Sequence, residues 1–294
     1  MCSDRAGQLD LFSGGVVDEI ADAKASFGVC DATVWPCNLS DPRVQRVKTL
    51  IADWGEARAG DGKVFFAGAW REVGTSAFYT GRGFGVFNPQ IASWILNGYA
   101  PRDGVCFDPF AGGGTRAIMA AKHGLEYVGV ELRAEEVAAV RARCAALGVG
   151  ERVRIIEGDA RSCPQVPDAS ADFLITCPPY WNLEQYDGGD ADLSMAETYE
   201  GFNAELQKAV HETARVLKPG AVSCWVVGLH RDEAGSLCAM NHDVARMHRA
   251  AGFRFHEEVI LHQQNTGAIQ RVGNFEKGRR FLIRVHEYAM IFMR

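Results

Sequence analysis

The stretch FDPFAGGGT at residues 107–115 decides the fold of this 294-residue chain. It follows the short apolar segment Val105–Phe107 and leads into Thr115–His123, which has the composition of a helix. Consecutive glycines permit a tight turn and let a ligand lie against the backbone. We therefore predict a strand, a ligand-binding turn and a helix in this order.

Outward from this turn, short apolar segments alternate with helical ones. Strands are expected at 105–107, 127–130, 153–156, 173–175, 222–227, 255–261 and 287–293, and helices from Pro89 onward and at 115–123, 134–147, 196–217 and 241–251. Such alternation is typical of an α/β fold with a parallel sheet. Residues 84–294 are thus expected to form one domain, and residues 1–83 an N-terminal extension of uncertain structure.

Acidic side chains follow the first three predicted strands. Glu131 ends the second strand, 19 residues after Gly112, and Asp159 ends the third. Ligands of such sheets bind outside the carboxyl ends of the strands. There, Glu131 can accept both ribose hydroxyls of a nucleoside, and Asp159 can accept from an adenine amino group. Asp108 would be unfavourable beside a phosphate and would suit a cationic amino group, so the pattern favours a sulfonium nucleoside over a dinucleotide.

The segment TCPPYW at residues 176–181 follows the fourth predicted strand. Pro178 and Pro179 cannot continue a central strand and stiffen the turn, which aims a backbone carbonyl and the next side chain. Tyr180 offers an aromatic face on which a flipped base can stack. The carbonyl can accept a hydrogen bond from an exocyclic amine, so methylation of that amine would depend on positioning and electrostatics, without a metal.

The two loops, in this order, resemble the first and fourth motifs of the DNA amino-methyltransferases. The run CPPYWNLEQY at 177–186, with Val226–Gly228 and His286–Tyr288, is similar to methylase domains encoded by bacteriophages and prophages. Phe87-Asn-Pro89 resembles the segment that helps to cover the cofactor in that family. The resemblance spans residues 84–294 and implies a Rossmann-like class I fold, with a seven-stranded, mostly parallel sheet and an antiparallel last strand.

The resemblance also implies S-adenosylmethionine as the cofactor of a site-specific DNA methyltransferase. The expected cofactor-binding residues are Phe87, Asn88, Asp108, Pro109, Phe110, Gly112, Gly114, Thr115, Glu131 and Asp159. The expected catalytic residues are Cys177, Pro178, Pro179 and Tyr180. The product would be a base methylated on its exocyclic amine, with cytosine N4 favoured over adenine N6, because a residue of serine size precedes the prolines.

Cys177 departs from the family pattern, which has Asp, Asn or Ser at this position. A thiol is a weak hydrogen-bond partner, so Cys177 could act as a serine substitute while the backbone carbonyl accepts from the amine. Alternatively, its thiolate could attack a pyrimidine ring and give carbon-5 methylation, or the enzyme could be weakened or altered in substrate. An RNA methyltransferase and a non-catalytic DNA-binding module also stay open.

A basic segment near residues 263–284 is the candidate for target recognition. Residues 263–294 contain six basic and two acidic residues, although the whole chain has a net charge of −6. Arg271, Lys277, Arg279 and Arg280 are expected to contact DNA, because arginine and lysine bind phosphate and arginine can read guanine. So small a segment predicts a short target site.

Composition favours a cytoplasmic protein, and the resemblance to phage and prophage enzymes implies a bacterial or phage-infected host cell. The nine cysteines form no CxxC pair, which fits a reducing compartment and gives no zinc pattern. The sequence has neither a secretory signal pattern nor an apolar run long enough to span a membrane. We therefore expect no metal and no membrane partner, and a homodimer is possible. The recognition sequence and the biological role are not encoded in any recognisable pattern.

Overall fold

The computed structural model describes residues 34–37, 87–183, 186, 188–232, 234–263 and 286–294. Its main strands are β1 (Val34–Cys37), β2 (Val105–Asp108), β3 (Glu126–Glu131), β4 (Val153–Glu157), β5 (Ala171–Thr176), β6 (Leu217–Val227), β9 (Arg254–Gln263) and β10 (His286–Met293). They form one sheet in the order β1-β9-β10-β6-β5-β2-β3-β4. The helices are α4 (Pro89–Tyr99), α5 (Thr115–His123), α6 (Ala134–Ala146), α7 (Tyr199–Val216) and α8 (Met240–Ala250).

The seven strands expected from the sequence are all present, and the predicted α/β class is confirmed. Strands β4, β3, β2, β5 and β6 run parallel to one another, whereas β10 is antiparallel to both of its neighbours, β6 and β9. The strand order reverses between β2 and β5, which creates a switch point where the loops after these two strands diverge. In open α/β sheets, ligands bind at this point, outside the carboxyl ends of the strands.

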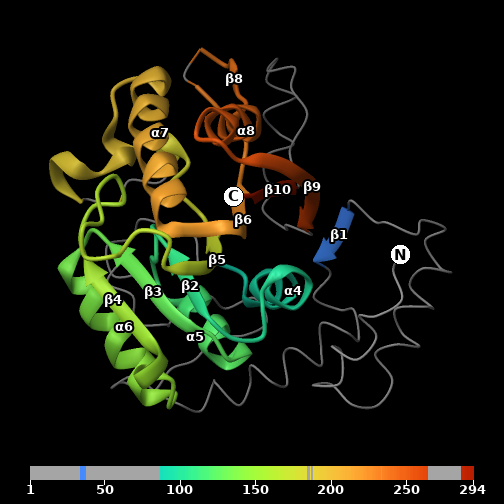
Figure 1. Ribbon diagram of the computed structural model, residues 1–294. Coiled ribbons are helices and arrows are strands. Elements are labelled where there is room, and N and C mark those ends of the chain that lie inside the picture. Colours follow the sequence, from blue (N-terminus) through green and yellow to red (C-terminus); the bar gives the residue numbers. More distant parts are fainter. Residues whose placement is uncertain (1–33, 38–86, 184–185, 187, 233, 264–285) are drawn as a thin grey trace, which may run out of the picture.

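The sheet lies between its helices (Figure 1), and a hydrophobic cluster packs on each face of it. On one face, Ile95 of α4 and Ile118 of α5 pack in a cluster that includes Phe173 of β5. On the other face, Phe202 of α7 packs in a cluster that includes the next strand residue, Leu174. Successive strand residues point to opposite faces, so a central strand buried on both faces is apolar throughout.

The structure corrects three boundaries. α7 begins at Tyr199, three residues later than expected, because Thr198 caps the helix by accepting from the N–H of Gly201 at 3.0 Å. β6 begins at Leu217, so Lys218-Pro-Gly220 lies within the strand, where its register against β5 shifts. The segment expected as an extension contributes β1, which pairs in parallel with β9.

Short elements that the sequence did not indicate connect the main ones. They are the hairpin strands β7 (His230–Arg231) and β8 (Leu237–Cys238), and the 3-10 turns η3 (Gly150–Arg152), η4 (Trp181–Leu183), η5 (Gly189–Ala191) and η6 (Leu193–Met195). Residues 264–285 lie outside the described part, so the predicted DNA contacts Arg271, Lys277, Arg279 and Arg280 stay predictions. None of the described helices has the length and apolar character of a membrane span.

Candidate active site

Asp108 holds the glycine-rich loop in place through hydrogen bonds of its buried carboxylate. Its side chain is fully buried, and its Oδ2 accepts from Arg116 Nε at 2.6 Å and from the Tyr127 hydroxyl at 2.7 Å. Its Oδ1 accepts from the Thr176 hydroxyl at 2.6 Å and from the backbone N–H of Phe110 at 3.0 Å. A carboxylate offers about four acceptor positions, and all four are used here. We therefore assign Asp108 to holding the loop, in place of the expected contact with the amino group of the cofactor.

Arg116 is the cation that this buried carboxylate balances. Burial alone would lower the pKa of Arg116, but the adjacent Asp108 raises it above the ordinary value, so the guanidinium stays charged. It also donates to the carbonyl of Phe110 and lies 4.7 Å from the centre of the Phe87 ring. Arg116 thus connects the loop to the segment before α4, where Asn88 caps the helix by accepting from Gln90 N at 2.9 Å.

Two glycines give the loop a conformation that other residues would strain. Gly112 has φ of 51° and Gly114 has φ of 81°, both in the left-handed region. A Cβ at Gly114 would lie 2.6 Å from Cγ1 of Val140 on α6, so the helix packing also requires glycine. The backbone is therefore the loop's only surface at these positions, which suits close approach of a ligand. Thr115 begins α5 directly after Gly114.

Glu131 links the ends of β2 and β3. Its Oε2 accepts from Gly112 N and its Oε1 from Arg133 N, both at 3.0 Å. Burial raises the pKa of Glu131 above its ordinary value, against the lowering effect of these donors and of the Arg133 charge. The predicted ribose acceptor thus lies against the predicted cofactor loop, and each of its oxygens keeps acceptor capacity for a ligand hydroxyl.

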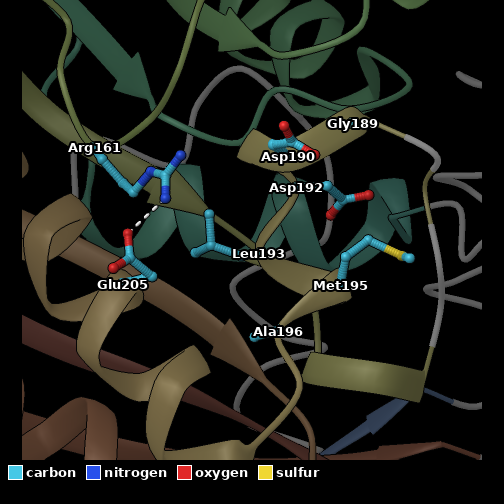
Figure 2. Close-up of a pocket in the computed structure, with 8 residues that line it drawn as sticks. All are labelled: Arg161, Gly189, Asp190, Asp192, Leu193, Met195, Ala196 and Glu205. Carbon is cyan, nitrogen blue, oxygen red and sulfur yellow. Dashed lines mark hydrogen bonds and ion pairs between the residues drawn. The ribbon is translucent and has the colours of Figure 1, made fainter.

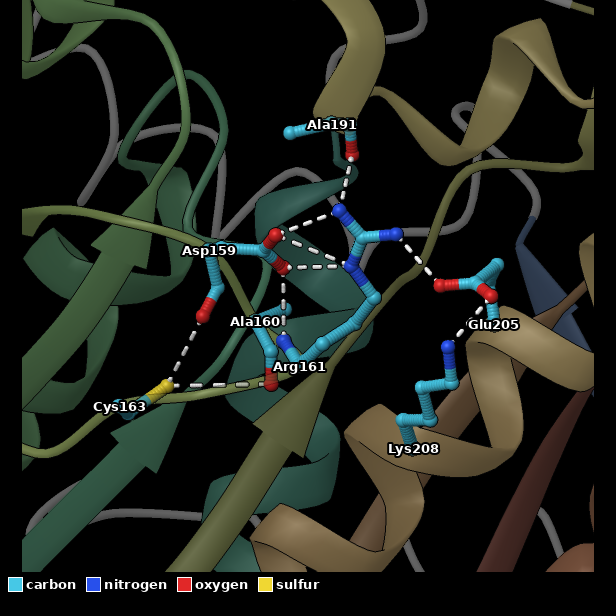
Figure 3. A network of polar contacts seen from close by, with 7 residues as sticks. All are labelled: Asp159, Ala160, Arg161, Cys163, Ala191, Glu205 and Lys208. Atoms are coloured by element: carbon cyan, nitrogen blue, oxygen red, sulfur yellow. Dashed lines mark hydrogen bonds and ion pairs between the residues drawn. The ribbon is translucent and has the colours of Figure 1, made fainter.

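Asp159, the predicted adenine acceptor, lies in an ion-pair network after β4 (Figure 3). Its carboxylate accepts from the Arg161 guanidinium, with a shortest distance of 2.6 Å, and from Arg161 N at 2.8 Å. Burial alone would raise the pKa of Asp159, but the Arg161 donors outweigh it and lower that pKa. Arg161 also donates to Glu205 of α7 at 2.5 Å and to the carbonyl of Ala191 at 3.4 Å. An adenine contact at Asp159 stays a prediction, and it would have to share the carboxylate with Arg161.

Replacing Arg161 with alanine is expected to destabilise the protein in a pH-dependent way. The network lowers the pKa of Asp159 and of Glu205, so it stabilises the fold above the pKa values of these groups in the unfolded chain. This stabilisation disappears as the pH falls through the lowered pKa values. In urea unfolding, the free energy of unfolding of the variant should be about 1 kcal/mol below that of the wild type at pH 7. This difference should become smaller below about pH 4.

Lys208→Ala is the matched control for that experiment. Lys208 donates to Glu205 at 2.6 Å and is the largest cause of the lowered pKa of Glu205, but it is exposed, and it acts on Asp159 through its charge rather than through the hydrogen bonds that Arg161 makes. At neutral pH, removal of the Lys208 side chain should change the free energy of unfolding less than removal of the Arg161 side chain does. A loss for Arg161→Ala that stayed constant from pH 7 to pH 3 would contradict the assignment.

A pocket of about 750 Å³ adjoins this network (Figure 2). Its lining residues are Arg161, Gly189, Asp190, Asp192, Leu193, Met195, Ala196 and Glu205. None of the predicted catalytic or cofactor residues lines it. Three of its eight lining residues are acidic and one is basic, so phosphate binding is unfavourable there.

The segment Cys177–Tyr180 follows β5, beside the glycine-rich loop after the neighbouring strand β2. The Tyr180 hydroxyl lies 3.2 Å from Cys177 Sγ and donates to Glu287 Oε1 at 3.2 Å. The Tyr180 ring packs against Gly228 at the end of β6, where a Cβ would lie 2.7 Å from Tyr180 Cε2. Burial, followed by the nearby Cys177 and Glu287, raises the pKa of Tyr180, so the phenol is neutral at physiological pH.

Trp181 fixes the chain directly after Tyr180. Its φ of 47° is in the left-handed region, which costs a non-glycine residue about 1–3 kcal/mol. The surroundings compensate for this strain: Trp181 Nε1 donates to the carbonyl of Ala196 at 2.8 Å, and the indole packs 5.6 Å from the rings of Tyr199 and His230. The orientation of the loop is therefore set by packing as well as by its prolines.

The structure thus gathers most of the predicted residues at the carboxyl edge of β2, β3 and β5. Phe87 and the carbonyl of Phe110 contact Arg116, and Asn88 is next to Phe87 in the chain. Glu131 contacts the loop of residues 108–115, and Thr176 joins that loop to the segment containing Pro178 and Pro179. Asp159 lies one strand further, after β4. Sequence reasoning missed Arg116, Arg161 and Glu287. For Glu287 a signal existed, since an antiparallel last strand begins at the edge where parallel strands end.

Comparison with known proteins finds a family match within the chain. Residues 108–224 match the model of a family described as a methyltransferase domain. The orphan methyltransferase M.BamHII of Bacillus amyloliquefaciens is 25% identical over 127 residues, which are 43% of this chain and 40% of that protein. The chain therefore matches well under half of the length of this relative.

One solved structure supports the shared fold, and two others are similar at lower TM-scores. The [4+2]-cyclase SpnF has a TM-score of 0.50 at 18% identity, over 70% of this chain and 80% of that one. TrmN from Thermus thermophilus has a TM-score of 0.49 at 17% identity, over 71% and 50% of the two chains. Geranyl diphosphate C-methyltransferase from Streptomyces coelicolor A3(2) has a TM-score of 0.48 at 16% identity, over 70% and 75%.

The acceptor set at the edge of the sheet fits a nucleoside. Carboxylates lie at the ends of the neighbouring strands β3 and β4, at Glu131 and Asp159, where they can accept from hydroxyl and amino groups. The left-handed glycines leave the loop backbone open to a ligand. The domain has the Rossmann-like class I methyltransferase fold, with seven mostly parallel strands and an antiparallel last strand, and its cofactor is S-adenosylmethionine.

Proposed function

We propose that this protein methylates the exocyclic amine of a flipped base in DNA, with cytosine N4 favoured over adenine N6. The observation that carries the proposal is the position of Cys177–Tyr180, at the switch point beside the glycine-rich loop. The match of residues 108–224 to a methyltransferase domain and the partial similarity to an orphan methyltransferase support it.

The protein's share of the chemistry is positioning. S-adenosylmethionine, when bound, supplies the electrophilic methyl group. Pro178 and Pro179 hold the loop so that a backbone carbonyl accepts a hydrogen bond from the target amine, which favours a tetrahedral nitrogen with its lone pair available. The Tyr180 ring, held against Gly228, provides a face for the base to stack on. Expulsion of water around these groups strengthens the hydrogen bonds.

The cofactor residues keep the roles predicted from the sequence, except Asp108. Glu131 would accept the ribose hydroxyls, and Asp159, with Arg161 beside it, would face the adenine. The backbone at Gly112 and Gly114 would lie along the cofactor, with Pro109, Phe110 and Thr115 in the same loop. Phe87 and Asn88 would cover it from the segment before α4.

Phosphate contacts are assigned to the basic segment near residues 263–284. The described loop after Tyr180 carries Asp190 and Asp192, which are unfavourable beside a phosphate backbone. Arg271, Lys277, Arg279 and Arg280 supply the positive charge that DNA binding requires. A segment of this size would read a short target.

Product identification tests the proposal. The purified protein is incubated with unmethylated DNA and S-adenosylmethionine, the DNA is digested to nucleosides, and the products are compared with standards by mass spectrometry. N4-methylcytosine is expected, and N6-methyladenine would keep the reaction class but change the base. Absence of methylated nucleosides with S-adenosylmethionine binding intact would refute the DNA substrate and favour RNA or a binding role.

Cys177→Ser separates amine methylation from carbon-5 methylation in the same assay. An exocyclic amine needs an acceptor of this size at position 177, so the serine variant should keep activity within about tenfold of wild type. Carbon-5 methylation needs a sulfur nucleophile, so that variant would lose activity and the wild-type product would be 5-methylcytosine.

A further inference from the structure

Three polar side chains from two segments that are distant in the sequence form a hydrogen-bonded chain after the end of β5. Cys177 Sγ lies 3.2 Å from the Tyr180 hydroxyl, which lies 3.2 Å from Glu287 Oε1. Glu287 is the second residue of β10 and directly precedes Tyr288, which pairs with Val227 of β6. Because β10 is antiparallel, its beginning lies at the edge where β5 and β6 end, so Glu287 reaches the loop after β5.

The direction of these hydrogen bonds follows from proton counting. A carboxylate only accepts, so the one hydroxyl hydrogen of Tyr180 points to Glu287. The contact between Tyr180 and Cys177 then requires the S–H to be the donor and the phenol oxygen to be the acceptor. A thiolate at Cys177 would compete with Glu287 for the same hydrogen. The hydrogen-bond chain therefore favours a neutral thiol whose hydrogen is directed at Tyr180, and it acts against the nearby charge of Arg116, which favours a thiolate.

We infer that Glu287 is a positioning residue that acts through Tyr180 to hold Cys177 as a neutral thiol, with its sulfur as a hydrogen-bond acceptor for the target amine. This inference rests on the proposed function for the identity of the amine, but the state of the thiol is independent of it. It explains how cysteine can stand where the related enzymes have an oxygen or nitrogen acceptor. It also disfavours carbon-5 chemistry, because that route needs a thiolate.

A matched tyrosine–glutamate pair joins α4 to the same sheet, away from this site. Tyr99, at the end of α4, donates its hydroxyl to Glu257 Oε2 at 2.6 Å, and Glu257 lies on β9, opposite Ile291 of β10. Removing the Tyr99 hydroxyl or the Glu257 carboxylate costs the same kind of hydrogen bond. Neither residue is in the chain that ends at Cys177.

Alkylation of Cys177 in the full-length protein without cofactor tests the inference. Iodoacetamide modification is followed by peptide mass spectrometry, which separates Cys177 from the other eight cysteines. Tyr180→Phe removes the acceptor of the Cys177 S–H. Glu287→Ala lets the Tyr180 hydroxyl turn toward the sulfur. In both variants the reactive thiolate of Cys177 should form more readily. Both variants should raise the rate by about threefold to tenfold, the effect of one hydrogen bond. Tyr99→Phe and Glu257→Ala should leave the rate unchanged.

An unchanged alkylation rate of Cys177 in both Tyr180→Phe and Glu287→Ala would overturn the inference. An equal increase of that rate in the Tyr99 and Glu257 variants would also overturn it, because it would indicate a general loss of packing in the protein. A kinetic readout then addresses the positioning role: Glu287→Ala should lower kcat with little change in the KM for S-adenosylmethionine, and Glu287→Gln, which keeps an acceptor for Tyr180, should restore most of it. If alkylation follows the expected pattern but the wild type methylates no DNA, the proposed function fails and the assignment of the thiol stands.

Discussion

Replacing Asp108 with alanine is expected to lower the free energy of unfolding by about 3–5 kcal/mol, because it leaves the buried Arg116 without its counter-charge. The substitution also removes the acceptor for the Tyr127 and Thr176 hydroxyls, both of which are buried. In a chain of this size, thermal unfolding should shift down by about 6–20 °C. Chemical and thermal denaturation followed by circular dichroism measure the change.

Asp168→Ala is the matched control, since it also removes the carboxylate partner of an arginine. Asp168 pairs with Arg215, but its side chain is 78% exposed, so the free energy of unfolding should change by less than about 1 kcal/mol. A loss below that value for Asp108→Ala would show that Asp108 does not hold the loop, and would restore the cofactor contact expected from the sequence.

The assignment of Asp108 also shows where sequence reasoning reached its limit. The glycine-rich turn and α5 follow from local preferences, and α5 spans Thr115–His123 as predicted. The donors to Asp108 cannot be deduced from its neighbours in the sequence, because they come from α5, from β3 and from the end of β5. An acidic residue before a glycine-rich loop therefore had two possible partners, the ligand or the protein, and only the three-dimensional arrangement distinguishes them.

Long-range contacts explain the remaining differences. Tyr180 was predictable as a site residue because the two prolines mark its loop, but its partner Glu287 is 107 residues away. Gly228 is informative only once the Tyr180 ring is seen against it. Arg161 looks like an ordinary surface residue in the sequence, yet it connects Asp159, the carbonyl of Ala191 and Glu205. The α/β class was predictable, because alternating strands and helices indicate a parallel sheet.

Glu131→Ala is expected to weaken binding of S-adenosylmethionine by at least about 100-fold, the largest functional effect that we predict for the cofactor residues. Two hydrogen bonds from ribose hydroxyls to one carboxylate contribute about 1.5–3 kcal/mol each. The alanine variant also releases the N–H of Gly112, which loosens the loop that the cofactor contacts. Isothermal titration calorimetry with S-adenosylmethionine and with S-adenosylhomocysteine measures the change without requiring a methyl acceptor.

Glu126→Ala supplies the control from the opposite end of the same strand. Glu126 begins β3 and Glu131 ends it, so the two variants remove one carboxylate each from the amino and carboxyl edges of the sheet. Glu126 pairs with Arg152 on the surface at 3.1 Å, and its loss should leave cofactor affinity unchanged. Equal affinities in the two variants would contradict a ligand site at the carboxyl edge. A selective loss in Glu131→Ala would indicate that the ribose lies at the end of β3, where Glu131 contacts the glycine-rich loop.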